Sequence, residues 1–322
     1  MHVMILGAAG MLGAKLSSAL AGTTRSARLT LVDVVPPSAP QSAVPTTCIS
    51  ADLSAPGTAQ DLINHRPDLI YHLAAIVSGE AEADFDKGYR INLDGTRYLF
   101  DAIRAAHDAD GYCPKVVFSS SIAVFGGPYP DVITDTFFQT PQTSYGTQKL
   151  IGELLLQDYT RRGIMNGVAL RLPTICIRPG APNKAASGFF SNIMREPLVG
   201  LPAVLPVPDT VCHSHASPRV TIQNLIHAGQ MDLSALGHRR GLNLPGCATT
   251  VAEQIEALRT VAGNDAVSLI RPQPDASIMR IVSAWPQRFQ ADRALALGFT
   301  AEKSFQQIIK VHLEDELGHA AT

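Results

Sequence analysis

The chain has 322 residues, of which 46% are hydrophobic and 17% charged, and its formal net charge is −2. This composition is typical of a globular protein with a sizeable core and excludes a long disordered chain. The near balance of 26 basic and 28 acidic residues gives no electrostatic signature of nucleic acid or of an anionic membrane, so neither is expected as a partner. No apolar run reaches the roughly 18–20 residues that a membrane helix needs.

The five cysteines are far apart along the chain, and no pair has the spacing of a metal site or a redox motif. They stand at positions 48, 113, 176, 212 and 247. We therefore expect no bound metal and no disulfide framework, and a reducing cytoplasm as the compartment. Residues 1–21 are apolar but contain three spaced glycines and lack a basic start, so they are expected to be folded rather than a secretory signal.

The first half of the chain alternates between short apolar runs and segments with helical periodicity. Strands are predicted at 3–6, 29–32, 46–50, 69–72, 116–119 and 168–172. Helices are predicted between them at 10–20, 59–65, 90–107 and 145–161. Near-continuous apolar strands separated by helices indicate a parallel sheet covered on both faces. The predicted fold class is therefore α/β, with a doubly wound parallel sheet that binds ligands at the carboxyl ends of its strands.

The regular winding stops after residue 172, where eight prolines follow between positions 173 and 218. Helices are still predicted at 187–194, 222–232, 251–261 and 304–314. We expect residues 1–172 to form the dinucleotide-binding domain. Residues 173–322 are expected to form mainly a smaller α/β lobe that binds the substrate, with some segments returning to the sheet.

The turn after the first strand is rich in glycine and opens the first predicted helix. Gly7 permits a tight turn, and Gly10 lets backbone N–H groups approach a pyrophosphate at the segment that contains Met11 and Leu12. Gly13 allows the helix to pack closely on the strand. An ordinary strand–helix turn rich in glycine is the alternative interpretation.

Two carboxylates follow the next strands. Asp33 lies at the end of the second strand, where it can accept hydrogen bonds from the adenosine ribose and would repel a 2′-phosphate. The sequence therefore predicts NAD, rather than NADP, as the cofactor. Asp52 and Leu53 follow the third strand and are placed against the adenine, although Asp52 can equally be a helix N-cap.

Tyr145 and Lys149 are four residues apart at the start of a predicted helix and hence share one face. A neighbouring ammonium lowers the pKa of a phenol from about 10 towards the working range of a general base. One strand–helix unit earlier, Ser119-Ser120-Ser121 ends an apolar strand at the carboxyl edge of the sheet. A hydroxyl there can bond to the reacting substrate oxygen, and the alternative is a solvated loop.

Five motifs occur in a fixed order along roughly residues 1–180. They are Gly7-x-x-Gly10-x-x-Gly13, His72-Leu73-Ala74-Ala75, Asn92-Leu93-Asp94-Gly95-Thr96, the run from Ser119 to Gly126, and Tyr145-x-x-x-Lys149. Together they resemble the extended short-chain dehydrogenase/reductase family of NAD-dependent epimerases and dehydratases. The resemblance implies a Rossmann-type domain that binds NAD.

The resemblance also implies roles for individual residues. Tyr145 would be the catalytic acid/base, Lys149 its electrostatic partner and a ligand of the nicotinamide ribose, and Ser121 the partner of the substrate hydroxyl. The backbone of the segment Leu73-Ala74-Ala75 would lie against the cofactor, and Asn92 would fix the adjacent helix beside the cofactor site. Phe125 stands where many relatives carry a tyrosine, so a second phenol would be absent from the pocket.

In the second half, the segments 178–184, 187–191, 195–198 and 215–219 and the late Trp285-Pro286 are unlike those of typical nucleotide-sugar enzymes. With them the whole chain resembles one branch of this family, and this resemblance implies oxidation of the C2 hydroxyl of a four-carbon sugar acid to a 2-oxo acid. Such a substrate needs a cation for its carboxylate, and Arg178, Lys184 and Arg219 are the candidates, with Arg219 placed first. Each of them can also be a solvated surface cation. Asn183 can bond to substrate hydroxyls or simply support its loop. His213 and His215 are at best polar residues of the pocket, because a third metal ligand is missing.

The expected function is therefore the NAD-dependent oxidation of a small sugar acid, with Tyr145 as the base. The alternatives are a nucleotide-sugar epimerase, dehydratase or reductase of the same family, or a non-catalytic NAD-sensing protein. The resemblance further implies a homodimer formed by the helices predicted at 90–107 and 145–161. In the alternative, the apolar stripes of these helices only face the sheet.

Overall fold

The computed structural model describes residues 1–23, 27–180 and 186–318. The chain divides into two compact units, between which it passes several times. The first unit comprises Met1–Val124, Pro141–Arg171 and Ile222–Asn243. The second unit comprises Phe125–Thr140, Leu172–Thr221 and Leu244–Thr322.

The first unit contains a parallel sheet of seven strands in the order β10-β6-β5-β4-β1-β2-β3. The strands are β1 (His2–Leu6), β2 (Arg28–Asp33), β3 (Thr46–Ser50), β4 (Leu69–His72), β5 (Lys115–Ser121), β6 (Asn166–Leu172) and β10 (Gly241–Asn243). Val3 of β1 lies opposite Leu29 of β2 on one side and Leu69 of β4 on the other. The sheet changes direction of winding between β1 and β4, which is the switch point at which such sheets bind dinucleotides. The predicted α/β fold class is confirmed.

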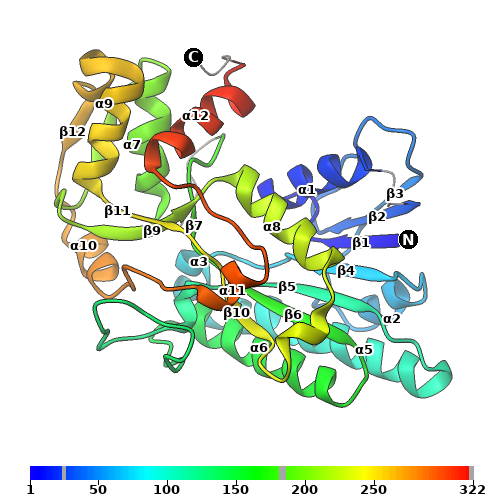
Figure 1. Ribbon diagram of the computed structural model, residues 1–322. Helices are drawn as coiled ribbons and strands as arrows, with labels where there is room; N and C mark the ends of the chain where they lie inside the picture. The colour runs from blue at the N-terminus through cyan, green and yellow to red at the C-terminus, as the bar shows by residue number, and fades with distance from the viewer. Residues whose placement is uncertain (24–26, 181–185, 319–322) are drawn as a thin grey trace. The chain divides into compact units, whose positions relative to one another are not determined.

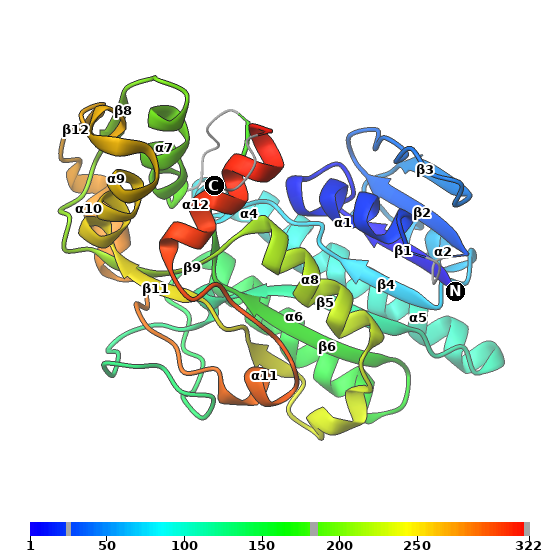
Figure 2. The ribbon, with the colours of Figure 1, turned by 45° about the horizontal axis from the view of Figure 1, so that its top comes forward.

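Helices cover both faces of this sheet (Figure 1). They are α1 (Met11–Ala21), α2 (Thr58–Ile63), α3 (Ser78–Ala83), α4 (Phe85–Gly88), η1 (Tyr89–Asp94), α5 (Gly95–Asp110), η2 (Ile122–Val124), α6 (Ser144–Arg161), α8 (Pro218–Gln230) and η3 (Leu233–Leu236). Figure 2 shows α1 and α8 over one face, and α5 and α6 over the other. The side chains of α2, α5 and α6 form one apolar core with the strands, which includes Leu62, Phe100 and Leu156.

Two predicted helices differ from the observed ones. The segment predicted as one helix at 90–107 consists of the π-helix η1 followed by α5, and such π-turns are frequent at functional sites. The helix predicted at 222–232 begins earlier, at Pro218, because proline is well suited to the first helical position. Ser217 precedes it, and its hydroxyl accepts a hydrogen bond from the N–H of Val220 at 3.1 Å.

The second half of the chain also contributes to the first unit. β10 pairs with β6 and extends the sheet by one strand, with Leu242 opposite Leu170. The side of α8 that contains Gly229 packs closely on β4, because a Cβ atom at Gly229 would lie 2.1 Å from the Tyr71 hydroxyl oxygen. The Lys115 ammonium also donates to the backbone oxygens of Gly229 and Met231, at 3.0 and 2.8 Å.

The second unit contains two small sheets and a group of helices. One sheet has three strands, β7 (Thr174–Ile175), β9 (Cys212–Ala216) and β11 (Cys247–Thr250), and the other pairs β8 (Ala203–Leu205) with β12 (Ile270–Pro272). The helices are α7 (Gly188–Leu198), α9 (Val251–Val267), α10 (Ala276–Ser283), α11 (Asp292–Ala296) and α12 (Phe305–Glu316). Apolar side chains of α7, α9 and α12, including Phe190, Leu258 and Ile308, form its core.

Candidate active site

The glycine-rich turn between β1 and α1 is closely packed at two of its three glycines. Gly7 has a positive φ of 86°, and a Cβ atom there would lie 2.6 Å from the backbone nitrogen of Ala74. A Cβ atom at Gly13 would lie 2.1 Å from the Gly7 carbonyl oxygen. Any larger residue at either position would therefore push the turn away from the sheet.

Gly10 is different, because a Cβ atom there would meet the Gly7 carbonyl oxygen at 3.4 Å, which is an ordinary contact. The fold itself therefore does not require glycine at this exposed position. Gly10 is the N-cap of α1, and a glycine cap has no side chain to accept the helix's first N–H groups. A pyrophosphate fits this cradle, because it would take these hydrogen bonds from the turn and from Met11 and Leu12.

Asp33 ends β2 beside this turn. One carboxylate oxygen accepts a hydrogen bond from the Ala9 N–H at 3.0 Å, and the other accepts from the Val35 N–H at 3.3 Å. These bonds hold the carboxylate next to the glycine-rich turn while the side chain remains half-buried. This is the position from which a carboxylate can bond to an adenosine ribose.

Asp52 does not cap a helix, because the N-cap of α2 is Gly57. Its Oδ1 accepts hydrogen bonds from the Ser54 N–H and hydroxyl at 2.9 and 2.6 Å, and Oδ2 lies 3.2 Å from the Arg90 guanidinium. Burial by itself would raise the pKa of Asp52, but these hydrogen bonds outweigh it and lower the pKa below its usual range. The side chain of Leu53 is buried in the core. Contact of Asp52 and Leu53 with adenine stays a prediction.

The segment after β4 lies against the glycine-rich turn. The Leu73 N–H donates to the Leu6 carbonyl oxygen at 2.8 Å, and Ala74 lies beside Gly7. Asn92, in η1, is buried and holds the following residues, because its Oδ1 accepts from the Ile76 N–H at 2.9 Å. Its Nδ2 donates to the Gln148 side-chain oxygen at 2.8 Å. Asn92 therefore connects the segment Leu73-Ala74-Ala75-Ile76 to α6.

The three serines at the end of β5 differ in their surroundings. Ser119 and Ser120 are buried, and their hydroxyls donate to the His72 carbonyl oxygen at 3.1 Å and to Glu153 Oε1 at 2.5 Å. Ser121 is half-buried, and its hydroxyl oxygen accepts from the Ala123 N–H at 3.1 Å. Of the three, Ser121 thus has the most accessible hydroxyl.

The first turn of α6 positions Tyr145 next to this strand end. The helix is capped by Thr143, whose hydroxyl accepts from the Gly146 N–H at 3.0 Å. Gly146 permits close packing on the turn that follows Ser121, since a Cβ atom there would lie 2.1 Å from the Ala123 carbonyl oxygen. Tyr145 is half-buried at this point.

Lys149 lies one turn further along α6 and is almost fully buried. Its ammonium donates to the Ser119 carbonyl oxygen at 2.9 Å and lies 5.7 Å from the centre of the Tyr145 ring. Burial lowers the pKa of Lys149 to about 7, although the Glu153 carboxylate acts in the opposite direction. Burial, together with the charge of Lys149, lowers the pKa of His72 to about 3, so this imidazole is neutral.

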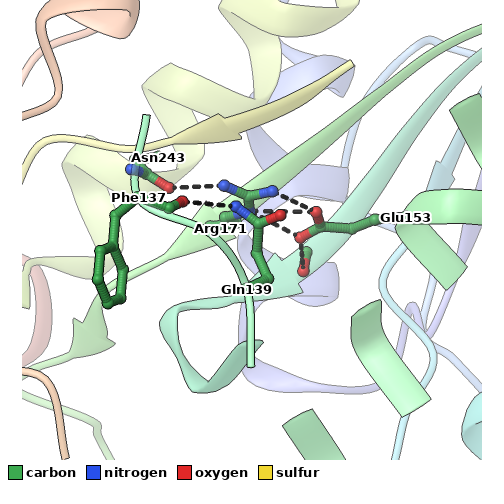
Figure 3. A network of polar contacts seen from close by, with 6 residues as sticks. Phe137, Gln139, Glu153, Arg171 and Asn243 are labelled. Carbon is green, nitrogen blue, oxygen red and sulfur yellow. Dashed lines mark hydrogen bonds and ion pairs between the residues drawn. The ribbon is translucent and has the colours of Figure 1, made fainter. Parts of the chain in front are cut away.

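The buried ion pair between Arg171 and Glu153, which Figure 3 shows, was not predicted from the sequence. The Arg171 guanidinium binds both carboxylate oxygens of Glu153, with its Nη2 2.7 Å from Oε2, and its Nη1 donates to Asn243 Oδ1 at 3.1 Å. The Ser120 hydroxyl bonds to the same carboxylate. One signal was available, because Glu153 follows Lys149 by four residues and so shares its face of α6.

The substrate residues predicted in the second unit have different outcomes. Asn183 and Lys184 lie outside the described residues. Arg178 is half-buried, and its Nε donates to the Ile175 carbonyl oxygen at 3.3 Å. Arg219 is engaged by two carboxylates of α12, at 2.5 Å from Asp315 and 2.7 Å from Glu314. Its role in substrate binding stays a prediction.

His213 and His215 are buried in the second unit among aromatic rings. His213 Nδ1 lies 3.1 Å from the Pro286 carbonyl oxygen and must donate to it, so Nε2 accepts from the Thr174 hydroxyl at 2.8 Å. The Gln254 amide lies 2.9 Å from His215 Nε2. Among the residues that the structure describes, no three His, Cys, Asp or Glu side chains are grouped as a metal site. Nor does any described helix have the length and apolar character to cross a membrane.

The fold and the site define a Rossmann-type protein with a glycine-rich turn at one strand end and a tyrosine–lysine pair at another. Residues 3–209 match the sequence profile of the NAD-dependent epimerase/dehydratase family. The chain belongs to this family, and its cofactor is NAD.

Two relatives match this chain along almost its whole length. One is the D-erythronate dehydrogenase of Cupriavidus necator, 45% identical over 98% of both chains. The other is the D-erythronate dehydrogenase of Haemophilus influenzae, 42% identical over 98% of this chain and all of the relative. A similar crystal structure is described as a nucleoside-diphosphate-sugar epimerase from Agrobacterium tumefaciens, with 60% identity and a TM-score of 0.97 over 99% of this chain and 95% of the other.

Proposed function

We propose that this protein oxidises the C2 hydroxyl of D-erythronate to give 2-dehydro-D-erythronate, with NAD as the electron acceptor. The observation that carries the proposal is the full-length identity of 42–45% to two D-erythronate dehydrogenases. Such identity spans the second unit as well as the NAD cradle, and the second unit is where we expect the substrate specificity to lie. The protein is accordingly a dehydrogenase that acts on a CH–OH group.

Tyr145 is the proposed base that accepts the proton of the C2 hydroxyl. Lys149 stabilises the phenolate form of Tyr145 through its buried ammonium, which the Ser119 carbonyl oxygen holds in place. Ser121 bonds to the reacting oxygen and so fixes the substrate hydroxyl in reach of Tyr145. Bound NAD supplies the acceptor for the hydride from C2.

A four-carbon acid has few atoms to recognise, so its carboxylate must provide much of its orientation. We propose Arg178 and Arg219 as the candidates for this contact in the described part of the chain, and the Arg178 guanidinium also donates to the Ile175 carbonyl oxygen. Arg219 is already held by Glu314 and Asp315, and Lys184 and Asn183 remain candidates from the sequence. Loss of one charge-assisted hydrogen bond, about 1.5–3 kcal/mol, would lower kcat/KM about 10- to 150-fold.

A nucleotide-sugar epimerase is the second candidate, because the similar Agrobacterium structure is described in that way. An epimerase uses the same tyrosine chemistry but returns the hydride, so it releases no NADH. The two candidates therefore differ in stoichiometry. A dehydrogenase produces one NADH for each substrate molecule that it consumes.

NADH production should be measured with aldonates of four to six carbons and, in parallel, with nucleotide sugars. The expected result is stoichiometric NADH with D-erythronate and none with the nucleotide sugars. Arg178→Ala should raise KM for D-erythronate and leave NAD binding unchanged, with Arg219→Ala as the comparison. Conversion of a nucleotide sugar to its epimer without NADH release would contradict the proposal.

We further propose that the protein is a cytoplasmic homodimer. Its five cysteines, all within the described residues, are unpaired thiols, as in a reducing compartment. The dimer would form through α5 and α6, whose outer faces expose Tyr98 and Leu154.

A further inference from the structure

The side chain of Lys149 is buried, and its ammonium group is positively charged when protonated. The groups that face it come from α6, β4 and β5. Tyr145 and Glu153 lie on α6, one turn on either side of Lys149. His72 ends β4 and is buried, while the Ser119 carbonyl oxygen of β5 accepts the ammonium hydrogen bond. Glu153 is the one carboxylate among these groups.

Glu153 is fixed from two directions. The Arg171 guanidinium at the end of β6 holds both of its oxygens, with a shortest contact of 2.7 Å. The Ser120 hydroxyl at the end of β5 donates to Oε1 at 2.5 Å. The side chain of Ser120 therefore faces α6, the helix that carries Glu153.

The pair is enclosed by β10. A Cβ atom at Gly241 would lie 2.7 Å from both Arg171 Nη2 and Glu153 Oε2, so the backbone of this strand covers the ion pair. The side chains of Arg171 and Glu153 are only 7% and 5% exposed. Solvent therefore screens both charges of the pair weakly, and the effect on Lys149 depends on Glu153 being the member that shares α6 with it.

We propose that Glu153 is a positioning residue of the active site. It clamps Ser120 and thereby the end of β5, which provides both the Ser119 carbonyl for Lys149 and the Ser121 hydroxyl. It also keeps a negative charge one helical turn from Lys149, so that Lys149 retains its proton and stabilises the Tyr145 phenolate. The inference rests on the proposed function for the identity of the base but not for the identity of the substrate.

The test is a pH titration of Tyr145 in the protein with NAD bound. Tyrosinate formation is followed by its ultraviolet absorbance, and the signal of a Tyr145→Phe variant is subtracted. Glu153→Gln preserves the shape of the side chain and removes its charge. Without the carboxylate, Lys149 loses its proton more easily, and a neutral Lys149 no longer stabilises the phenolate. We therefore expect the Tyr145 midpoint to move upward by about one pH unit, the lower end of the shift of about 1–3 units that an adjacent opposite charge causes. For an active substrate, the acid limb of kcat/KM should move in the same direction.

Because Glu153→Gln leaves Arg171 as a buried charge without its counter-ion, this variant can unfold. Glu153→Gln combined with Arg171→Met removes both charges and keeps the fold testable. Asp158→Asn is the matched control, because it removes a carboxylate from the same helix at a half-exposed position, where its partner is Arg161. It should leave the midpoint unchanged.

Lys149→Met tests whether Glu153 acts on Tyr145 through Lys149. If Glu153 acts through Lys149, the shift caused by Glu153→Gln with Arg171→Met should disappear in a Lys149→Met background. An unchanged midpoint in the paired variant, or an equal shift with and without Lys149, would overturn the inference. Absence of NADH production from erythronate by the wild type would contradict only the proposed substrate, because the tyrosinate titration needs no substrate.

Discussion

Lys149 is buried, so water screens the charge of its ammonium group only weakly. Water has little access to the ammonium group, and the hydrogen bond to the Ser119 carbonyl oxygen fixes its direction. In such surroundings a positive charge 5.7 Å from the ring of Tyr145 favours phenolate more strongly than an exposed lysine would. The pair therefore depends on burial as much as on the four-residue spacing that the sequence displays.

Tyr145→Phe removes the phenolic oxygen and changes the side-chain volume very little. General base catalysis contributes about 10²- to 10⁴-fold, so kcat should fall by this factor. The affinity for NAD, measured by calorimetry, should remain close to that of the wild type. Lys149→Met should reduce both kcat and NAD affinity, and a Tyr145→Phe protein with normal turnover would exclude Tyr145 as the base.

Asp33 should determine the choice between NAD and NADP. Asp33→Ser with Val34→Arg replaces the carboxylate and adds a guanidinium at an exposed neighbouring position. One charge-assisted bond to the 2′-phosphate should shift the ratio of kcat/KM for the two cofactors about 10- to 150-fold towards NADP. Val34→Arg alone is the control, and equal use of both cofactors by the wild type would contradict the role of Asp33.

Single residues show the limit of sequence reasoning at this scale. The residue pattern placed three serines at a strand end without ranking them, and only the family resemblance singled out Ser121, because the partners of Ser119 and Ser120 come from β4 and α6. It also placed Arg219 first among the cations, which stays a prediction, but it gave no sign of the ion pairs of Arg219 with Glu314 and Asp315, about 96 residues away. Contacts of this kind depend on tertiary packing and have no local signature.

At the scale of elements, the turn between β1 and α1 contains one glycine that the packing requires, Gly13, and one that it does not require, Gly10. Gly13→Ala gains about 1 kcal/mol of helix propensity but places Cβ 2.1 Å from a carbonyl oxygen, and such overpacking costs about 1–3 kcal/mol or more. We expect a net loss of stability in urea denaturation, together with weaker NAD binding.

Gly10→Ala is the matched variant in the same turn. Its Cβ meets only an ordinary contact at 3.4 Å, so the urea midpoint should change little. The methyl group would, however, occupy the space through which a pyrophosphate approaches the backbone. NAD affinity should therefore fall without a comparable loss of stability, and unchanged affinity would place the phosphates elsewhere.

The outer faces of α5 and α6 lead to a prediction about assembly. Leu154 is 58% exposed on α6, and Tyr98 is 37% exposed on α5. Leu154→Arg should convert the proposed dimer to a monomer in sedimentation velocity, since a buried unpaired charge opposes association. Lys310→Glu, an exposed change on α12, should leave the mass unchanged. A wild-type mass of one chain at micromolar concentration would exclude the dimer.

Elements were predicted well where the hydrophobic pattern is local. Thr46–Ser50 and Leu69–His72 coincide with β3 and β4, because each is a short run between turn residues. The π-helix η1 was missed, since a π-turn retains the helical pattern of apolar residues. The earlier start of α8 was signalled by Ser217-Pro218, an N-cap followed by proline, which the prediction did not use.

For the molecule as a whole, we expect the second unit to become less stable as the pH falls. Burial lowers the pKa of His213 to about 4, and burial together with the neighbouring imidazole lowers that of His215 well below its usual range. Both are neutral in the folded unit, whereas the unfolded chain binds their protons below pH 6.5. The free energy of unfolding should therefore fall as the pH falls from 6.5 towards 4, by about 2–3 kcal/mol for His213 alone at pH 4.5.

Urea denaturation at pH 7.5 and pH 4.5 measures this loss, with near-ultraviolet circular dichroism as the signal. His213→Gln retains polar groups but does not titrate in this range, so its stability should depend less steeply on pH. Equal pH dependence of the wild type and the variant would show that His213 is protonated in the folded protein.

The pairing of β10 with β6 has a consequence for protein synthesis. The ribosome makes the chain from the N-terminus, and Asn243 follows Arg171 by 72 residues. While those residues are being translated, β6 is an open sheet edge, and the Glu153–Arg171 pair lacks the backbone of Gly241 that later encloses it. A nascent chain that is interrupted in this interval exposes β6 as an unpaired strand, next to an ion pair that is only partly covered. We expect chaperones to bind at this edge and aggregation to start there.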